Sequence, residues 1–536
     1  MIVTHGVSLR YGKRILFDDV SIKFNDGNCY GVIGANGAGK STFLKILSGD
    51  IDSTDGHIEI APGKRMAVLR QNHFEYDEFT VKETVIQGHQ ELYQIMKEKD
   101  AIYMKEDFSD EDGIKASELE EKFAEMNGWE ADSEAGELLN GIGILDNLHD
   151  QLMKDIPNNL KVRVLLAQAL FGNPDILILD EPTNDLDVET ISWLEDFLLD
   201  FKNLVIVVSH DRHFLDTVCT HIADVDFKKI KLYTGNYSFW YESSQLALKQ
   251  QQQQNKKAEE KKKELQEFIA RFSANVKKSK QATSRKKMLE NLNIEDIQPS
   301  TRRYPGIIFS QEREAGDQVL NVENLSYEPF FKNLNFSIRK GDKVAILSRD
   351  SLATNYFYKI LNSEIEAHSG SINWGVTIKK EYLPNENNHY FSGELNLIDW
   401  LRQYSQEKDE TYIRGFLGKM LFSGEDVFKM SNVLSGGEKV RCMLSKLMLS
   451  EANLMMLDEP TNHLDLESII SLNDGLKSYS GIVLLTSHDH TMIQTVANRI
   501  IEITPNGMID KHSDYESYTI DPKLQDRRNQ LYLTNV

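Results

Sequence analysis

The sequence GVIGANGAGKSTFLKIL, residues 31–47, runs from an apolar strand through a glycine-rich turn into a helical pattern. Its centre fits the pattern G-x-x-x-x-G-K-S of a Walker A loop. The fixed positions of that pattern are Gly34, Gly39, Lys40 and Ser41. In such a loop the backbone N–H groups surround phosphate oxygens, and the lysine supplies a point charge while the hydroxyl can ligate Mg²⁺. The stretch therefore predicts a phosphate site where a strand meets a helix.

Two apolar strands further along the chain end in residues that suit the same chemistry. The run ILILDEP closes on Asp180 and Glu181, and the run LVIVVSH closes on His210. Carboxylates beside a phosphate loop can hold a metal ion and orient water, and a histidine can donate to developing phosphate charge. Three elements in this order predict a nucleotide site.

The second half of the chain repeats the first. LMMLDEPTNHLD, with Asp458 and Glu459, matches LILDEPTNDLD at an offset of 278 positions, and His488 matches His210 at the same offset. Around the Walker A loop the offset is 314, so the first half carries 36 additional residues after Gln71. Self-similarity on this scale, in a chain of 536 residues, predicts two domains of one kind.

Three motifs place the sequence beside a known family: LSGGEKVR from Leu434, DEPTN twice, and the histidines His210 and His488. Together they resemble tandem ABC-type ATPase domains. Two such cassettes in one chain, with an insertion in the first and a charged linker between them, resemble the ABC-F proteins over residues 1–519. The resemblance implies an α/β fold with two ABC-type P-loop ATPase domains in tandem, joined by a long α-helical hairpin linker, with a helical arm inserted in the first domain.

The resemblance also sets the expected domain boundaries. The first ABC domain should cover 1–240, with the arm at about 85–136, the linker 241–303, and the second ABC domain 304–536. In the family the cassettes pair head to tail, so that each nucleotide lies between the Walker A loop of one and the LSGG motif of the other. We therefore expect a monomer whose two cassettes pair within the chain.

One of the two composite sites keeps its full set of motifs, and the family implies that it binds ATP with Mg²⁺ and hydrolyses it. The catalytic residues should be Glu181, His210 and Gln71, and the metal residues Ser41, Gln71 and Asp180. The ATP-binding residues should be Tyr11, Gly34, Asn36, Gly37, Gly39, Lys40, Ser41, Thr42, Ser435, Gly436 and Gly437. Tyr11 has an alternative role as an ordinary half-buried strand tyrosine.

The other composite site has lost both of its loops. The LSGGE position of the first cassette reads Ile-Pro-Asn-Asn-Leu at residues 156–160, and the second Walker A position reads SRDSLATN at residues 348–355. Thr354 and Asn355 replace the lysine and serine, while Asp458, Glu459 and His488 remain. We expect slow or absent hydrolysis there. Two questions stay open: whether this site holds a nucleotide, and whether its carboxylates remain only to complete a strand end.

The linker changes composition and charge. Overall the chain carries 61 basic and 83 acidic residues, a formal charge of −22. Within residues 271–287, however, seven residues are basic and none is acidic: Arg271, Lys277, Lys278, Lys280, Arg285, Lys286 and Lys287. The resemblance implies that this tip approaches tRNA or rRNA on the ribosome. The alternative is a solvated helical hairpin without a partner. The inserted arm is acidic, which favours a basic ribosomal protein or a merely solvated face.

Composition excludes several classes of protein. Hydrophobic residues make up 40% and charged residues 27%, as in ordinary globular chains. No apolar run is long enough for a membrane span, and the start lacks the pattern of a signal peptide, so we expect a cytoplasmic protein. The predicted function is that of an ABC-F ATPase acting on the ribosome as a translation factor. The alternatives are a factor that protects the ribosome from antibiotics, or a DNA-associated or transporter-coupled ATPase.

Overall fold

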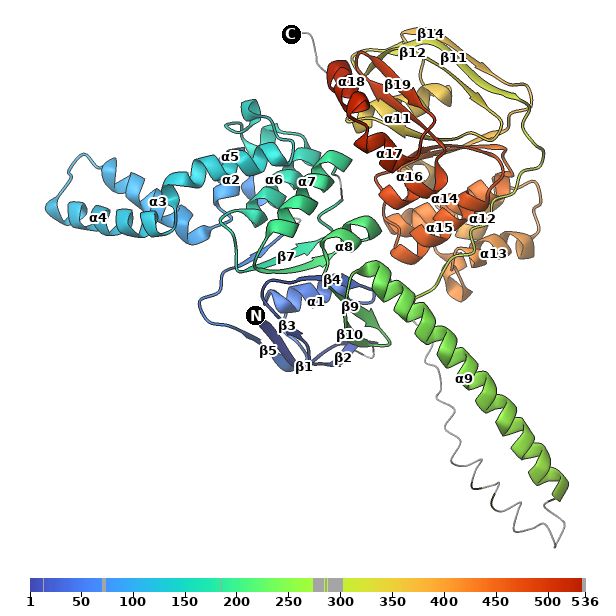
Figure 1. Cartoon of the computed structure of the whole chain (residues 1–536), viewed down its shortest axis with the longest axis horizontal. Coiled ribbons are helices and arrows are strands. Elements are labelled where there is room, and N and C mark those ends of the chain that lie inside the picture. Colours follow the sequence, from blue (N-terminus) through green and yellow to red (C-terminus); the bar gives the residue numbers. More distant parts are fainter. Residues whose placement is uncertain are drawn as a thin grey trace.

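The computed structural model covers the whole chain and describes residues 1–12, 14–69, 74–184, 186–272, 284, 287 and 302–532. It shows two α/β lobes, which we call the first and second cassettes (Figure 1). A long helix, α9, leaves the first cassette, and a pair of helices, α3 and α4, projects from another side of it. Among the described residues, no helix combines the length and apolar character needed to span a bilayer.

The first cassette contains a six-stranded sheet in the order β10-β9-β4-β8-β7-β6 and an antiparallel sheet β2-β1-β3 with β5 also paired to β1. Strands β4, β7 and β8 are parallel neighbours and almost wholly buried, as expected for strands covered on both faces. The strands are β1 (Ile2–Tyr11), β2 (Arg14–Val20), β3 (Lys23–Phe24), β4 (Cys29–Ile33), β5 (Asp55–Ile60), β6 (Met66–Val68), β7 (Ile176–Asp180), β8 (Leu204–Val208), β9 (His221–Asp226) and β10 (Lys229–Thr234).

The helices of the first cassette cover this sheet and form the arm. They are α1 (Lys40–Leu47), α2 (Val81–Ile86), α3 (Gln90–Tyr103), α4 (Asp110–Glu125), α5 (Ala131–Gly141), α6 (Asn158–Leu170), α7 (Val188–Asp200) and α8 (Arg212–Val218). Helix α4 starts with a capping box in which Ser109 and Asp112 satisfy each other's backbone N–H groups. This cap separates α4 from the loop that follows α3.

The second cassette repeats this architecture, with a six-stranded sheet in the order β19-β18-β13-β17-β16-β15. Its strands are β11 (Gln318–Tyr327), β12 (Phe331–Arg339), β13 (Lys343–Leu347), β14 (Ser369–Trp374), β15 (Lys380–Leu383), β16 (Leu454–Asp458), β17 (Ile482–Thr486), β18 (Arg499–Thr504) and β19 (Gly507–Lys511). Its helices are α11 (Ser351–Leu361), α12 (Leu397–Arg402), α13 (Glu410–Lys419), α14 (Gly436–Ser450), α15 (Leu466–Ser478), α16 (His490–Val496), α17 (Tyr515–Ile520) and α18 (Pro522–Tyr532). The predicted α/β fold with two tandem cassettes is confirmed.

The 36 additional residues of the first cassette can now be placed. Helices α2 and α5 have counterparts in α12 and α13 at the offsets of the sequence repeat, whereas α3 and α4 have none. These two helices pack against each other and extend away from the sheet (Figure 1). The insertion is therefore an antiparallel helical arm, and the two ends of the expected range 85–136 belong to the cassette body.

The two cassettes meet through contacts that are related by the sequence repeat. Leu466, the first residue of α15, packs in a hydrophobic core of the first cassette, and Val188, the first residue of α7, packs against a core of the second. These two residues are 278 positions apart. Arg212 also pairs with Asp489 across the interface at 3.3 Å. Each cassette thus contributes one apolar side chain to its neighbour.

The linker begins with α9 (Tyr237–Phe272), a helix of 36 residues, which is about 54 Å long at 1.5 Å per residue. The helix begins three residues before the expected end of the first cassette at residue 240. Its first residues belong to that cassette, since Tyr237 and Trp240 are buried in its core. Its far end lies well away from both cassettes (Figure 1). The expected return helix falls outside the described residues, apart from residues 284 and 287, which are helical.

Candidate functional site

The glycine-rich loop of the first cassette connects the carboxyl end of β4 to α1. Gly37 and Gly39 have φ angles of 76° and 104°, which residues with a Cβ rarely adopt. A Cβ on Gly34 would lie 2.6 Å from the carbonyl oxygen of Val225. Gly39 is the N-cap of α1, and no side chain caps that helix. The positive end of α1 is therefore open to an anion.

Lys40 lies in the first turn of α1 with its side chain folded over this loop. Its Nζ donates to the carbonyl oxygen of Gly34 at 2.8 Å and lies 3.5 Å from that of Ala35. Burial lowers the pKa of Lys40, while carboxylates from both cassettes, Glu181 and Glu467 foremost, act in the opposite direction. A buried ammonium with two carbonyl partners would gain a stronger hydrogen bond from a phosphate oxygen.

Ser41 and Asp180 form the pair of oxygen donors beside Lys40. Asp180 ends β7, and the Ser41 hydroxyl favours its ionised form. Burial raises the pKa of Asp180, and the Ser41 contact and Lys40 oppose this rise. Its Oδ1 is buried and has no hydrogen-bond partner among the described residues. A hydroxyl and an unpartnered carboxylate oxygen fit a hard divalent cation such as Mg²⁺.

Glu181 and His210 form a buried pair at the ends of β7 and β8. The Glu181 Oε2 accepts the backbone N–H of His210 at 3.2 Å, and its Oε1 lies 3.2 Å from the His210 Nε2. Burial raises the pKa of Glu181 to about 7. Burial, together with the charge of Lys40, lowers the pKa of His210 to about 3. The histidine is therefore neutral, and the carboxyl can exchange a proton near neutral pH.

A cavity of about 580 Å³ lies between this set of residues and the second cassette, and we call the interface around it the first seam. Ten of the predicted residues line it: Asn36, Gly37, Gly39, Lys40, Ser41, Thr42, Glu181, His210, Gly436 and Gly437. The structure thus places the loop of one cassette opposite the LSGG segment of the other. His488, which the sequence predicts for the degenerate site, also lines this cavity.

The LSGG segment forms the start of α14. Ser435 is the N-cap, and it forms a capping box with Glu438. A Cβ on Gly436 would lie 3.0 Å from the ring of His463, and one on Gly437 would lie 2.6 Å from the His463 carbonyl oxygen. The close approach of the DEPTNHLD loop therefore requires glycine at position 437 and favours it at position 436.

Four predicted residues do not line the described part of the cavity, namely Tyr11, Gly34, Asp180 and Ser435. Tyr11 ends β1 and is 55% exposed. This exposure does not decide between its two predicted roles, an ATP-binding residue and an ordinary strand tyrosine. Asp180 lies beneath Ser41, and Gly34 lies against β9. Gln71 lies outside the described residues.

The degenerate loop of the second cassette has a different backbone. Helix α11 begins at Ser351, three residues earlier in the repeat than α1. The carboxylate of Asp350 caps it by accepting the N–H of Leu352 at 2.9 Å. The N–H of Arg349 donates to the hydroxyl of Tyr532 in α18 at 3.0 Å. Groups of the chain itself therefore satisfy backbone donors at the start of α11 and in the loop before it.

The remaining residues of the degenerate site are also engaged within the chain. The Asn355 amide donates to Asp458 at 3.3 Å, and the Thr354 hydroxyl donates to the carbonyl oxygen of Ser351 at 2.9 Å. Burial, with Glu459 adding to it, raises the pKa of Asp458 to about 7. His488 and Glu459 repeat the geometry of the first pair, with 3.2 Å between Nε2 and Oε1.

A second cavity of about 450 Å³ lies between α7 of the first cassette and the degenerate loop with α17 and α18, and we call this interface the second seam. None of residues 156–160 is among its described lining residues. The segment that replaces LSGGE in the first cassette instead forms the start of α6, with Pro157 at the N-cap and no side-chain cap. The second seam therefore lacks a phosphate loop on one side and a serine–glycine cap on the other.

The basic residues of the linker tip fall largely outside the described part of the chain. Lys277, Lys278, Lys280, Arg285 and Lys286 are not described, and Arg271 is described only as part of α9. Lys287 is helical and exposed. Their predicted contact with RNA stays a prediction.

Several residues of the first seam were not predicted. His463, Asn462 and Thr461 from the second DEPTN segment line the cavity, as do Thr183 and Asn184 from the first. Their signal was present in the sequence, because the segment after each strand-ending DE is nearly identical in the two halves. A repeated loop that follows a site residue is a candidate for the same site.

The comparisons with known proteins agree with this architecture. A family model described as ABC transporter matches residues 17–184 and 331–462, and a second model with the same description matches residues 223–309. The ATP-binding protein YkpA of Bacillus subtilis (strain 168) is 60% identical over 99% of this chain and 100% of its own length. The probable ATP-binding protein YbiT of Escherichia coli O157:H7 is 43% identical over 97% and 99% of the two chains.

A solved structure shares the arrangement of both cassettes. It is the archaeal ribosome recycling factor aABCE1, in complex with the archaeal ribosomal stalk protein aP1. The match covers 98% of each chain with a TM-score of 0.60 and 17% sequence identity. At this identity the likeness concerns the fold alone.

Proposed function

Because this chain belongs to the ABC-F type of tandem-cassette ATP-binding proteins, we propose that it is an ATPase that acts on the ribosome as a translation factor. ATP binds in the first seam and draws the two cassettes together. The linker then engages ribosome-bound tRNA or rRNA, and hydrolysis releases it. The second seam holds the cassettes together without turnover.

The composition of the first cavity carries this proposal. Its lining joins Lys40, Glu181 and His210 of one cassette to Gly436 and Gly437 of the other. A ligand that contacts both walls stabilises the closed arrangement by the difference in its affinity for the closed and open states. The triphosphate of ATP is an anion that can contact the glycine-rich loop on one side of the seam and the N-terminus of α14 on the other.

The protein groups have separable roles in the proposed reaction. Glu181 orients the attacking water and accepts its proton, since a base with a pKa of about 7 is matched to neutral solution. His210 is neutral and holds Glu181 through its backbone N–H and its ring. Lys40 neutralises the outer phosphates. Mg²⁺, when bound with ATP, would offset phosphate charge, and Ser41 and Asp180 are the residues that would hold it.

Two observations support the ribosome as the partner. In the sequence, the basic segment 271–287 begins at the end of α9, whose far end lies away from the cassettes (Figure 1), and phosphate backbones are bound by clusters of basic residues. The fold neighbour aABCE1 is named a ribosome recycling factor in its own complex. The acidic first turn of α4, with Asp110, Glu111 and Asp112, suits a basic ribosomal protein rather than RNA.

Ribosome co-sedimentation with ATP tests the proposal. We expect Glu181→Gln to hold ATP without hydrolysing it and to remain in the ribosome pellet, whereas Glu459→Gln, its counterpart in the second seam, should behave like wild type. Pelleting should weaken as salt is raised, because the linker contacts are ionic. If Glu181→Gln hydrolyses ATP at the wild-type rate, the assignment of the site is wrong. If it traps ATP yet binds DNA or membranes instead of ribosomes, the cellular role is wrong.

A further inference from the structure

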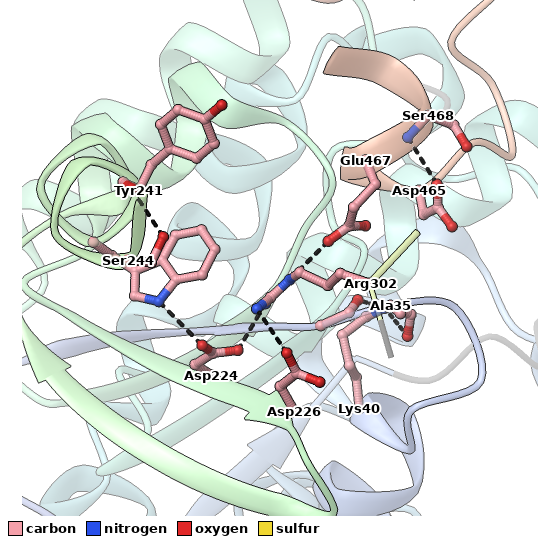
Figure 2. Close-up of polar contacts among 12 residues, drawn as sticks. Ala35, Lys40, Asp224, Asp226, Tyr241, Ser244, Arg302, Asp465, Glu467 and Ser468 are labelled. Carbon is pink, nitrogen blue, oxygen red and sulfur yellow. Dashed lines mark hydrogen bonds and ion pairs between the residues drawn. The ribbon is translucent and has the colours of Figure 1, made fainter. Parts of the chain in front are cut away.

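Arg302 lies where the linker returns to the cassettes, and it contacts carboxylates of both. Its Nη2 is 2.7 Å from Asp224 Oδ1 and its Nη1 is 3.6 Å from Asp226 Oδ2, both on β9 of the first cassette. Its Nε donates to Glu467 Oε1 at 2.7 Å, in the first turn of α15 of the second cassette. Figure 2 shows the guanidinium between these two groups. One side chain of the linker thus bridges the cassettes.

The carboxylates around Arg302 are buried, so their charges depend on it. The Arg302 side chain is 11% exposed, and those of Asp226 and Glu467 are 6% and 5% exposed. Burial disfavours the guanidinium charge, but the surrounding carboxylates outweigh it and raise the pKa of Arg302. Removing one partner from such a cluster leaves uncompensated charge inside the protein. The three acids therefore strongly favour the position in which Arg302 lies between them.

The same cluster holds the beginning of the linker. Trp240, in the first turns of α9, donates its indole N–H to Asp224 Oδ2 at 3.2 Å. The Arg302 guanidinium lies over the Trp240 ring, 4.7 Å from its centre. Asp224 therefore accepts hydrogen bonds from both ends of the linker, because Trp240 lies in the first turns of α9 and Arg302 lies at the other end of the linker. A displacement of Arg302 would therefore change the contacts of Trp240 at the start of α9.

The cluster also extends to the phosphate loop. Glu467 and Asp465 act electrostatically on Lys40 from the second cassette, and Asp465 caps α15 by accepting the N–H of Ser468 at 2.9 Å. In the view of Figure 2, Glu467 lies above Arg302 and Lys40 lies below it. Glu467 therefore acts on two cations: Lys40, which serves the nucleotide, and Arg302, which belongs to the linker.

We propose that Arg302 is a positioning residue that couples occupation of the first seam to the position of the linker. The coupling rests on the proposed function, in which phosphates bind at Lys40. When bound phosphates neutralise the charge of Lys40, the negative charge of Glu467 is balanced mainly by Arg302. The ion pair between Glu467 on α15 and Arg302 in the linker then becomes stronger. By reciprocity, a docked Arg302 favours the seam that is closed around nucleotide.

The test measures whether ATP moves the linker. Spin labels are attached to cysteines introduced at Glu260, exposed on α9, and at Lys477, exposed at the end of α15; the native cysteines are buried. In the Glu181→Gln background, which keeps ATP intact, we expect ATP to shift and narrow the distance distribution. Arg302→Met should abolish the shift and weaken ATP binding by about tenfold. The matched control is Arg303→Met, at the exposed neighbouring position, which should retain both effects.

Two further variants guard against a folding defect in Arg302→Met. Glu467→Gln removes the charge that the second cassette presents and leaves both β9 carboxylates in place, so it should also abolish the shift. Arg302→Lys keeps the charge but cannot serve three carboxylates at once, so it should restore the shift in part. If ATP shifts the distance in every folded variant as it does with Arg302 present, the coupling is wrong. If ATP produces no shift even with Arg302 present, ATP-driven closure in the proposed function fails, and the coupling with it.

Discussion

In the first cassette the chain leaves β4 through a loop with two left-handed glycines, and α1 begins at Lys40 without a side-chain cap. In the second, the chain leaves β13 and enters α11 three residues sooner, at Ser351, with Asp350 as the cap. Both segments join equivalent strands of sheets with the same strand order. The difference between them therefore arises locally, from the loss of glycine, rather than from a change of fold.

This difference shows how a phosphate-binding loop can be lost while the sheet around it keeps its strand order. A helix N-terminus must be satisfied by something. In the first cassette the loop keeps it open, and a ligand can satisfy it. In the second, the carboxylate of Asp350 caps α11, so the chain itself satisfies that helix N-terminus. The helix start of the degenerate loop is thus already capped by the chain.

The sharpest way to break this comparison is to change the strand-end carboxylate of each seam. Glu181→Gln should lower the steady-state rate of ATP hydrolysis by about 10²- to 10⁴-fold, because it removes the proposed base. Glu459→Gln should change that rate by less than about twofold, since no phosphate loop faces it. Phosphate release measured side by side decides between them. Equal losses in the two variants would mean that both seams turn over.

A second prediction concerns the lysine. Lys40→Met should weaken ATP binding by about 10- to 100-fold, since a charge-assisted hydrogen bond contributes about 1.5–3 kcal/mol. Thr354→Lys, which restores a lysine at the equivalent position, should add no second bound nucleotide, because α11 and Asp350 still fill the space. Equilibrium binding of a fluorescent ATP analogue measures both stoichiometry and affinity. Two nucleotides bound to Thr354→Lys would show that the lysine alone was missing.

The pH dependence of hydrolysis sharpens the comparison further. Burial raises the pKa of Glu181 to about 7 in the free protein, and a general base works in its ionised form. We therefore expect kcat/KM to fall as pH drops through about 7, and to level off above it. Asp458 also has a pKa of about 7, so the Asp458→Asn variant is the control and should leave the profile unchanged. A flat profile between pH 6 and 8 would contradict the assignment of Glu181.

The smallest effect is expected for Tyr532, whose hydroxyl contacts the degenerate loop of the second cassette. The Tyr532 hydroxyl accepts the N–H of Arg349 and donates to the carbonyl oxygen of Ile503. Tyr532→Phe should lower the free energy of unfolding by about 1–2 kcal/mol, because it leaves two backbone groups without this partner. ATP hydrolysis should be unchanged. Chemical denaturation measures the first effect, and a loss of hydrolysis without a loss of stability would place Tyr532 in the first seam.

Much of this fold and site could be predicted from the sequence because the motifs are local. Asp180, Glu181 and His210 each end an apolar run, and the parallel sheet brings the ends of such runs to one edge. The repeat then transfers the whole pattern to the second half. The early start of α11 was less visible, although Asp350 two residues before Leu352 is an ordinary capping signal.

The contacts that sequence reasoning missed join distant parts of the chain. Arg302 was read only as the end of the linker, yet its partners lie 78 and 165 positions away. Tyr532 belongs to no motif of the sequence, yet its hydroxyl accepts the N–H of a residue 183 positions earlier. No local periodicity reports such pairings, since each depends on how complete domains pack. The contact of the linker tip with RNA remains a prediction from its charge and from the family resemblance.

The exchange of Leu466 and Val188 between cores has a consequence for how this molecule could be divided. Each lobe, taken alone, would present to water an apolar hollow shaped for the other's side chain. Two fragments produced by cleavage within the linker should therefore recombine spontaneously when mixed, and each should melt at a higher temperature in the mixture than by itself. The covalent connection would then serve chiefly to raise the local concentration of a pair that already fits.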